Sequence, residues 1–311
     1  MLDKTDGEKM NNIKGSNPLC SFVAVSDLHI TPRLRTKTAG KRRSAWKWIE
    51  QNHPDFCLMA GDITNGCGAD EFEIAKSELE PLARKIPFFV GYGNHDYIPN
   101  NSGAIASPEA RSNFSAWADK AVASHGGTIE SFGDNRCFSS RFCNIQIISM
   151  DCAASYPSAI AGEEQLEWLD KMLSETDSDR FRIVMSHFPL NNYVPSRTGK
   201  KQMSYVRDSS KQQKLFEKHK NILFFSGHTH FSLDLESPAV LFDEENRIAY
   251  CNTASVGNVV PNAQAVKRGE TENASGSMGL YVEVYEKHIE VIGVDFLNDK
   301  TIDRCEFEIE M

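Results

Sequence analysis

Short clusters of aspartate, histidine and asparagine recur along this chain, and each follows an apolar run. Carboxylate oxygen together with imidazole nitrogen suits Mn, Fe or Zn better than Ca. A polar side chain just past the end of a strand stands where open α/β sheets bind their ligands. The side chains in question are Asp27, His29, Asp62, Asn94, His187, His228 and His230. The pattern favours a metal centre assembled from several strand ends.

The spacing of these residues indicates how they would share ions. Asp27 and His29 are two positions apart, so both side chains can reach one ion as the chain leaves its strand. Asp62 follows a glycine, which lets the backbone pass close to an ion, and its two carboxylate oxygens make it the natural bridge between two metals. Asn94 offers a neutral amide oxygen, which moderates the negative charge of the site.

Composition limits the function classes. The 311 residues are 40% hydrophobic and 25% charged, enough for one large α/β domain or two smaller ones. A net charge of −9 argues against a dedicated nucleic-acid or anionic-membrane protein, because such binding is driven by an excess of Lys and Arg. Phosphate substrates stay open, since bound divalent cations invert the local field.

The same composition bears on the compartment. No apolar run has the length of a signal-peptide core or a membrane span, so we expect a soluble, cytoplasmic protein with no membrane partner. The eight cysteines lie far apart without a C-x-x-C spacing. That spacing favours free thiols over structural disulfides or a thiolate zinc site, as in reduced compartments.

Alternating patterns predict the order of the elements. Residues 1–20 are polar and read as a flexible N-terminal arm, and residues 21–311 as one domain. Strands at 22–27, 55–61 and 87–91 with helices near 40–52 and 70–84 follow the βαβαβ rhythm of a parallel sheet. Further strands are expected at 136–141, 144–150, 181–186 and 222–226, and helices at 108–124 and 162–174.

The C-terminal part reads as antiparallel strands, whose use as cap, dimer surface or core stays open. They are expected at 240–242, 247–251, 280–285, 289–294 and 305–309. If each half of the chain supplies one sheet, the economical packing is an α/β fold with four layers, an α/β/β/α sandwich of two mixed sheets with helices outside. Residues 191–215 are polar and basic, and form a candidate lid or substrate loop.

In chain order the clusters read D-x-H, G-D, G-N-H-D, H and G-H-x-H. This set resembles the signature of the calcineurin-like metallophosphoesterase superfamily, and the likeness spans residues 22–230. Residues 138–151 and 162–169 resemble its cyclic-nucleotide phosphodiesterase branch. The resemblance implies one shell of Asp27, His29, Asp62 and His230, and a second of Asp62, Asn94, His187 and His228.

The resemblance also implies a mechanism for a metal-dependent phosphoric ester hydrolase. A water or hydroxide held between two ions, its pKa lowered towards neutral, would attack phosphorus in line with the leaving oxygen. His95 would protonate the leaving alkoxide. The group that orients His95 stays open, because Asn65 stands where related phosphatases carry a tyrosine ligand or an orienting aspartate. Asp96 is the nearest carboxylate in sequence.

A small phosphoester is the expected substrate. The leading hypothesis is a phosphodiesterase acting on cyclic nucleotides, the alternative a phosphomonoesterase for small molecules or proteins, and a third a non-catalytic interaction platform. Oligomeric state stays open, a homodimer included. Candidate phosphate contacts are Arg33, Arg35 and the basic residues Arg197, Lys200, Lys201, Arg207 and Lys211, for which a solvated charged loop is an equal explanation. Tyr97, Asn65 and Asn191 are candidate pocket residues.

Overall fold

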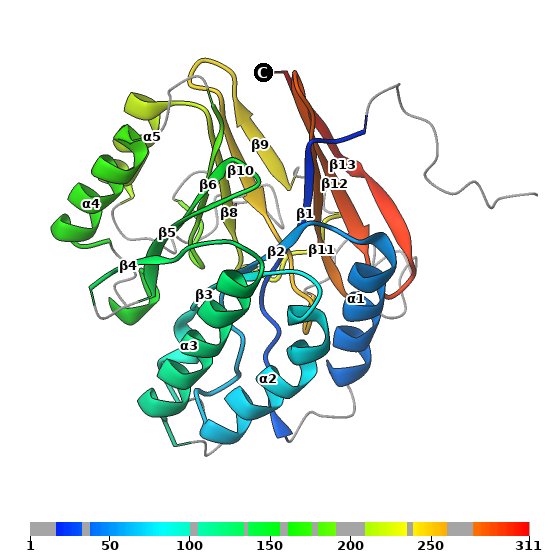
Figure 1. The fold of residues 1–311 in the computed structure, drawn as a ribbon. Helices are drawn as coiled ribbons and strands as arrows, with labels where there is room; N and C mark the ends of the chain where they lie inside the picture. Colours follow the sequence, from blue (N-terminus) through cyan, green and yellow to red (C-terminus); the bar gives the residue numbers. More distant parts are fainter. Residues whose placement is uncertain are drawn as a thin grey trace, which may run out of the picture.

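The computed structural model describes residues 17–32, 38–99, 105–133, 136–155, 161–175, 180–190, 209–234, 239–259 and 276–310. Two β-sheets lie face to face between two groups of helices, so the molecule has four layers (Figure 1). The expected α/β architecture of two mixed sheets flanked by helices is confirmed. Most of the predicted N-terminal arm lies outside the described residues.

The first sheet combines both ends of the chain. Its strand order is β13 (Lys300–Glu310), β12 (His288–Asp295), β11 (Met278–Val284), β1 (Cys20–Val25), β2 (Phe56–Ala60) and β3 (Phe88–Gly91). Strands β1, β2 and β3 are parallel. Each is buried along its whole length, as strands covered on both faces must be.

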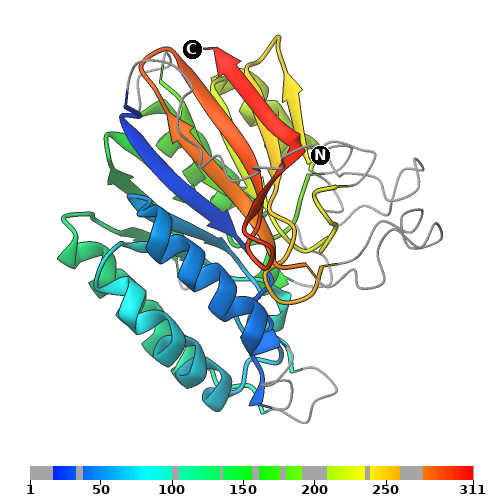
Figure 2. The same ribbon diagram turned by 90° about the vertical axis from the view of Figure 1, so that its right-hand side faces the viewer.

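Helices α1 (Thr38–Asn52), α2 (Ala69–Ala83) and α3 (Pro108–Ser124) cover the outer face of this sheet (Figure 2). The start of α3 follows local rules: the Ser107 hydroxyl accepts a hydrogen bond from the Ala110 amide at 3.2 Å, and Pro108 occupies the first turn. None of the helices in the described ranges is long and apolar enough to cross a membrane.

The second sheet has the strand order β4 (Glu130–Phe132), β5 (Cys137–Phe142), β6 (Ile145–Ser149), β7 (Arg182–Met185), β8 (Ile222–Ser226), β10 (Ile248–Asn252) and β9 (Val240–Asp243). Strands β6, β7, β8 and β10 are parallel. Helices α4 (Glu163–Ser174) and α5 (Ser210–His219) pack outside it, and two short 3₁₀ turns, η2 (Asn94–Asp96) and η3 (Ala153–Ser155), complete the fold.

Aromatic side chains fill the space between the sheets. Phe22 of β1 stacks on Phe56 of β2 with ring centroids 4.7 Å apart. Across the interface it meets Phe225 of β8 edge-on at 5.6 Å. Such pairs add to the free energy gained from burial, and they hold the two sheets at a defined separation.

One expectation about the C-terminal strands is correct only in part, and another is wrong. Strand β10 pairs antiparallel with β9, as expected, but runs parallel to β8 on its other edge. Strands β11 to β13 do not build the second sheet; β11 pairs antiparallel with β1, with Ala24 opposite Leu280 (Figure 2). Strand β1 offers two edges, and β2 occupies only one of them. The C-terminal strands cover the other edge and belong to the core.

The prediction of a loop over residues 191–215 is also partly wrong. From Ser210 the chain forms α5, with Gln212 and Phe216 on its buried face, and residues 191–208 lie outside the described ranges. The polar composition of this helix obscured its helical period, because its large apolar side chains are only Phe216, which is buried, and Leu215, which is partly buried.

Candidate metal centre

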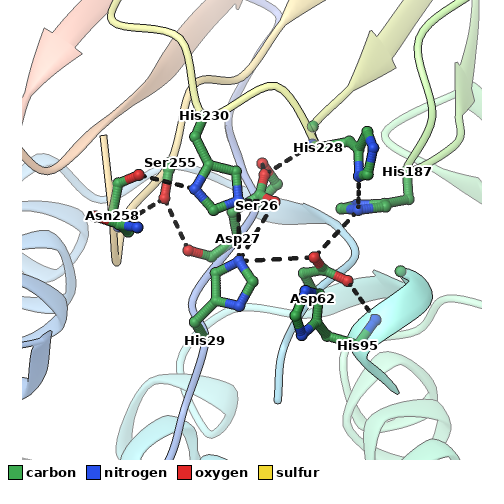
Figure 3. A network of polar contacts seen from close by, with 12 residues as sticks. Ser26, Asp27, His29, Asp62, His95, His187, His228, His230, Ser255 and Asn258 are labelled. Carbon is green, nitrogen blue, oxygen red and sulfur yellow. Dashed lines mark hydrogen bonds and ion pairs between the residues drawn. The ribbon is translucent and has the colours of Figure 1, made fainter. Parts of the chain in front are cut away.

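All seven predicted ligands lie past the carboxyl ends of parallel strands. Asp27 and His29 follow β1, Asp62 follows β2 and Asn94 follows β3 in the first sheet, while His187 follows β7 and His228 and His230 follow β8 in the second. Because both sheets present these ends at the same side of the sandwich, the side chains of Asp27, His29, Asp62, His187, His228 and His230 meet between them (Figure 3).

One group of donors consists of Asp27, His29, Asp62 and His230, whose ligand atoms lie within 4.8 Å of one another. The Nε2 atoms of His29 and His230 are 3.0 Å apart, and His230 Nε2 is 3.0 Å from Asp27 Oδ1. His29 Nε2 lies 3.6 Å from Asp62 Oδ2. Ligands bound to one transition ion at about 2.0–2.2 Å stand roughly 3 Å apart, so these atoms surround a place for one ion.

A second group consists of Asp62, His187 and His228. His187 Nε2 lies 3.3 Å from Asp62 Oδ2 and 3.2 Å from His228 Nδ1. The Asp62 carboxylate therefore belongs to both groups, as a bridge between two ions must. The structure brings six of the seven predicted ligands together in these groups.

The seventh predicted ligand, Asn94, has a buried oxygen that lacks a hydrogen-bond partner within the described residues. This oxygen is Oδ1, and Oδ1 of Asp27 is also buried without such a partner in the described part of the chain. A buried oxygen without a partner costs free energy unless something else binds it. A hard or borderline cation meets this need, so the residues present fit a two-ion centre.

Backbone carbonyls orient two of the histidines. His187 Nδ1 lies 2.9 Å from the Ala60 carbonyl oxygen, and His230 Nδ1 lies 2.8 Å from that of Asn258. A carbonyl only accepts, so we assign the proton of each ring to Nδ1, which leaves the lone pair on Nε2 directed at the ion sites. The sequence offered no signal for these main-chain partners.

A loop after β10 supports the first group. The Ser255 hydroxyl donates to the Asp27 carbonyl oxygen at 2.9 Å and accepts from the Asn258 amide at 2.8 Å (Figure 3). The Ser26 hydroxyl donates to Asp27 Oδ2. The sequence analysis missed these residues, because Ser26 lies inside the predicted strand 22–27 and Ser255 and Asn258 lie several positions beyond the predicted strand 247–251.

Five of the ligands occupy the left-handed region of backbone space. The φ angles are 55° at Asp27, 46° at His29, 52° at Asp62, 67° at His228 and 54° at His230. Each such residue costs of order 1–3 kcal/mol and persists only where the surrounding structure demands it. The concentration of strain at these positions is typical of a binding site.

In the centre, protonated imidazoles balance the negative charges of the carboxylates, and a bound cation could take their place. Burial alone would raise the pKa of Asp27, but the His230 and His29 imidazoles hold it well below its usual range. Burial alone would lower the pKa of His187, but the Asp62 carboxylate raises it to about 9. Burial and the charge of His187 lower the pKa of His228 to about 3. Bound metal would take over the balancing positive charge and release such protons.

His95 lies beside the bridge. Its backbone N–H donates to Asp62 Oδ1 at 2.9 Å, and its ring lies edge-on to that of His29 with centroids 4.7 Å apart. Its Nδ1 is 2.8 Å from the carbonyl oxygen of Asn65. The main chain of Asn65 therefore orients the imidazole, a role that its side-chain identity does not reveal.

The Asp96 carboxylate binds backbone amides of the neighbouring loop. Its carboxylate accepts hydrogen bonds from the backbone amides of Gly93 at 2.9 Å, Ile63 at 3.2 Å and Thr64 at 2.8 Å. It thus ties the loop after β2 to the turn that carries Asn94 and His95. Proximity in sequence is a poor guide here, because Asp96 faces the loop backbone.

The remaining candidates fall into three groups. Tyr97 is half-buried, donates to the Asp151 carboxylate and lies under the Arg111 guanidinium at 4.1 Å from its ring centroid. Lys211 is exposed on α5 and pairs with Glu163 at 2.8 Å. Arg33, Arg35, Asn191, Arg197, Lys200, Lys201 and Arg207 lie outside the described residues.

Comparison with known families agrees with this geometry. The family described as calcineurin-like phosphoesterase matches residues 20–232, well over half of the chain. The chain belongs to this family. The family implies a metal-dependent phosphoric ester hydrolase with a centre of two metal ions. The cyclic-nucleotide branch, the identity of the metals and the roles of single residues stay predictions.

Individual relatives are distant. An uncharacterised protein of Schizosaccharomyces pombe is 24% identical over 165 residues, which cover 47% of this chain and 29% of that relative. A dimetal phosphatase from Danio rerio superposes with a TM-score of 0.57 at 14% identity over 92% of this chain and 99% of its own. GAP50, the anchor in the inner membrane complex of Plasmodium, superposes with a TM-score of 0.52 at 14% identity, over 94% of this chain and 89% of its own. At these identities the two structures show a shared fold.

Removing the bridge tests the centre. We expect Asp62→Asn to weaken metal affinity by more than the roughly 10–100-fold that loss of an outer-shell partner costs, because an amide has only one acceptor oxygen. Metal content per chain after gel filtration measures this. Asp170→Asn, the same change on the surface of α4, should keep both ions. Two tightly bound ions in Asp62→Asn would contradict the bridging role.

Close packing at Gly93 offers a second test. A Cβ there would lie 2.1 Å from Asp62 Oδ1 and 2.5 Å from the Asp62 amide nitrogen, so Gly93→Ala must displace the bridge. We expect at least about a tenfold loss of metal affinity, measured by competition with a chromophoric chelator. At Gly162 an added Cβ meets nothing within 4 Å, and Gly162→Ala is the matched control. Equal affinities in both variants would show that the glycine does not shape the site.

Proposed function

We propose that this phosphoester hydrolase acts on small phosphodiesters, cyclic nucleotides among them, with small phosphomonoesters as the alternative. The observation that carries the proposal is the Asp62 carboxylate shared by two groups of metal-ligand atoms, with the His95 imidazole beside it. When bound, the two ions supply Lewis acidity and a hydrolytic water of lowered pKa. The remaining steps belong to side chains of this chain.

In this proposal one ion is held by Asp27, His29, Asp62 and His230, and the other by Asp62, Asn94, His187 and His228. The short distances among donor atoms support both sets. So do the carbonyl contacts that direct Nε2 of His187 and His230 towards the ions, and the unpartnered Asn94 oxygen. These groups would also fix the orientation of a phosphoryl group between them.

His95 is proposed as the general acid. With Nδ1–H held by the Asn65 carbonyl, the protonated ring presents Nε2–H, and that proton passes to the leaving oxygen as its bond to phosphorus breaks. The neutral imidazole then regains a proton from solvent. A diester with an alkoxide leaving group needs this help most, because an alkoxide is a strong base.

The preference for diesters rests on the stretches that resemble the cyclic-nucleotide branch. They meet near the centre: the Gln165 amide donates to the Asp151 carbonyl oxygen at 3.1 Å, and Asp151 accepts from the Tyr97 hydroxyl. Tyr97 follows His95 by two positions. This connection to the segment of the proposed acid supports a part for the two stretches in substrate selection.

His95→Asn separates acid catalysis from metal binding. We expect metal content to be unchanged and kcat on an alkyl diester to fall by about 10² to 10⁴. With a p-nitrophenolate leaving group the loss should be much smaller, because that group departs without a proton. His125→Asn, at a histidine that contacts the Ala83 carbonyl far from the centre, should match the unaltered enzyme. Loss of the metals from His95→Asn would overturn the assignment.

The substrate class is decided by a parallel assay of the Mn-loaded protein on bis-p-nitrophenyl phosphate, p-nitrophenyl phosphate and cyclic AMP. Turnover of both diesters above that of the monoester is the expected result, and Asp62→Asn serves as the inactive control. Activity confined to the monoester would remove the diesterase proposal. Fewer than one tightly bound transition ion per chain would favour the interaction platform.

A further inference from the structure

Two cysteines and one aspartate converge at the end of the sandwich opposite to the dinuclear centre. Cys20 opens β1, Asp55 directly precedes β2, and Cys143 lies in the turn between β5 and β6. Ligand atoms of all three lie within 4.8 Å of one another. Asp27 follows the other end of β1, which is roughly 20 Å long, so this cluster is separate from the phosphoesterase centre.

The turn that carries Cys143 has an unusual sequence for its shape. Phe142 pairs with Ile145, so Cys143 and Asn144 form a two-residue hairpin loop, with φ of 49° and 61°. This type of turn favours Asn, Asp or Gly at both positions. A cysteine there adopts the left-handed region at a cost, and an observed outlier of this kind is a reason to look for a function.

Packing holds the turn against the other sheet. The Phe142 ring, next to Cys143, meets the Phe56 ring, next to Asp55, edge-on with centroids 5.8 Å apart. Phe142 also lies 5.9 Å from Phe89. The convergence of Cys143 and Asp55 therefore follows from the core between the sheets, and does not depend on exposed side chains alone.

The carboxylate is fixed as well. Asp55 Oδ2 accepts a hydrogen bond from the Ser21 amide at 2.7 Å, next to Cys20. Among the described residues, no lysine or arginine forms an ion pair with Asp55. Two thiols and a carboxylate thus face one another, and all three side chains are of types that bind transition metals.

We propose that Cys20, Asp55 and Cys143 form a second, mononuclear metal site for a thiophilic divalent ion, Zn²⁺ before others, with solvent as the fourth ligand. Two sulfurs and one carboxylate oxygen are a donor set of zinc, whereas Mg²⁺ and Ca²⁺ take oxygen alone. On binding, both thiol protons leave to solvent as the two metal–sulfur bonds form. The ion would join β1 of the first sheet to the β5–β6 turn of the second.

A disulfide between Cys20 and Cys143 explains less. Asp55 has no part in a disulfide, whereas all three side chains have a role as ligands of one ion. Cys143 at the exposed turn leaves a route for that ion. The described cysteines are free thiols, as their spacing predicted, and the proposed site would use two of them as ligands.

Cobalt provides a direct test, because a sulfur-to-Co²⁺ charge-transfer band in the near ultraviolet needs a thiolate, and none of the proposed ligands of the dinuclear centre carries sulfur. The full chain is reduced, its dinuclear centre filled with Mn²⁺, and Co²⁺ added without oxygen. We expect the band to appear, to reach its plateau at one Co²⁺ per chain, and to vanish in Cys143→Ser. Asp55→Asn should weaken Co²⁺ binding by about tenfold or more.

Controls separate this proposal from the others. Cys251→Ala removes a buried thiol elsewhere and should keep the band, and Cys143→Ser should keep phosphoesterase activity. No band in the unaltered protein, or a band that survives in Cys143→Ser, would overturn the site. Loss of two free thiols on treatment with hydrogen peroxide, together with no Co²⁺ band, would assign a disulfide and equally overturn it.

Discussion

The burial of two carboxylates, those of Asp27 and Asp62, constrains the residues around the metal centre. Each is almost fully inaccessible to solvent, and taking such an ion out of water costs several kcal/mol after relaxation. The structure offsets this cost with four histidines around the pair and with backbone amides directed at the oxygens, such as those of His228 and His95. Only a compact positive charge satisfies all of these donors and acceptors together.

The sandwich brings this arrangement about through strand direction. Parallel strands in both sheets end at the same side, so a short turn after each strand is enough to deliver one or two ligands. The chain must then reverse sharply, and the left-handed φ angles at Asp27, Asp62 and His228 are the result. The strain is held in place by the buried strands behind it, which is why ligand placement and core packing cannot be separated in this fold.

Local signals were sufficient for much of the fold and for the ligand types. The apolar period that starts at Pro108 places α3 correctly at Pro108–Ser124, and the run before Gly227 places β8 at Ile222–Ser226. The pairing of β11 with β1 was not predictable from such signals, because an apolar strand fits either edge of a sheet equally well. Partners that act through the main chain, such as the Asn65 carbonyl, leave no trace in side-chain identity. The cluster of Cys20, Asp55 and Cys143 was not predictable for a third reason: pairing of β1 with β2 brings Cys20 and Asp55 together, but Cys143 joins them only through the packing of one sheet on the other.

Strand β1 connects the dinuclear centre with the proposed zinc site. Its carboxyl end leads to Asp27 in the dinuclear centre, and its first residue, Cys20, belongs to the proposed zinc site. On each side of β1 a ligand from the first sheet meets a ligand from the second: His228 and His230 at one end and Cys143 at the other. Because β1 is hydrogen-bonded along both edges and fully buried, it holds its two ends at a fixed separation. An ion at the Cys20 end would stabilise the contact between the two sheets roughly 20 Å from the phosphoesterase centre.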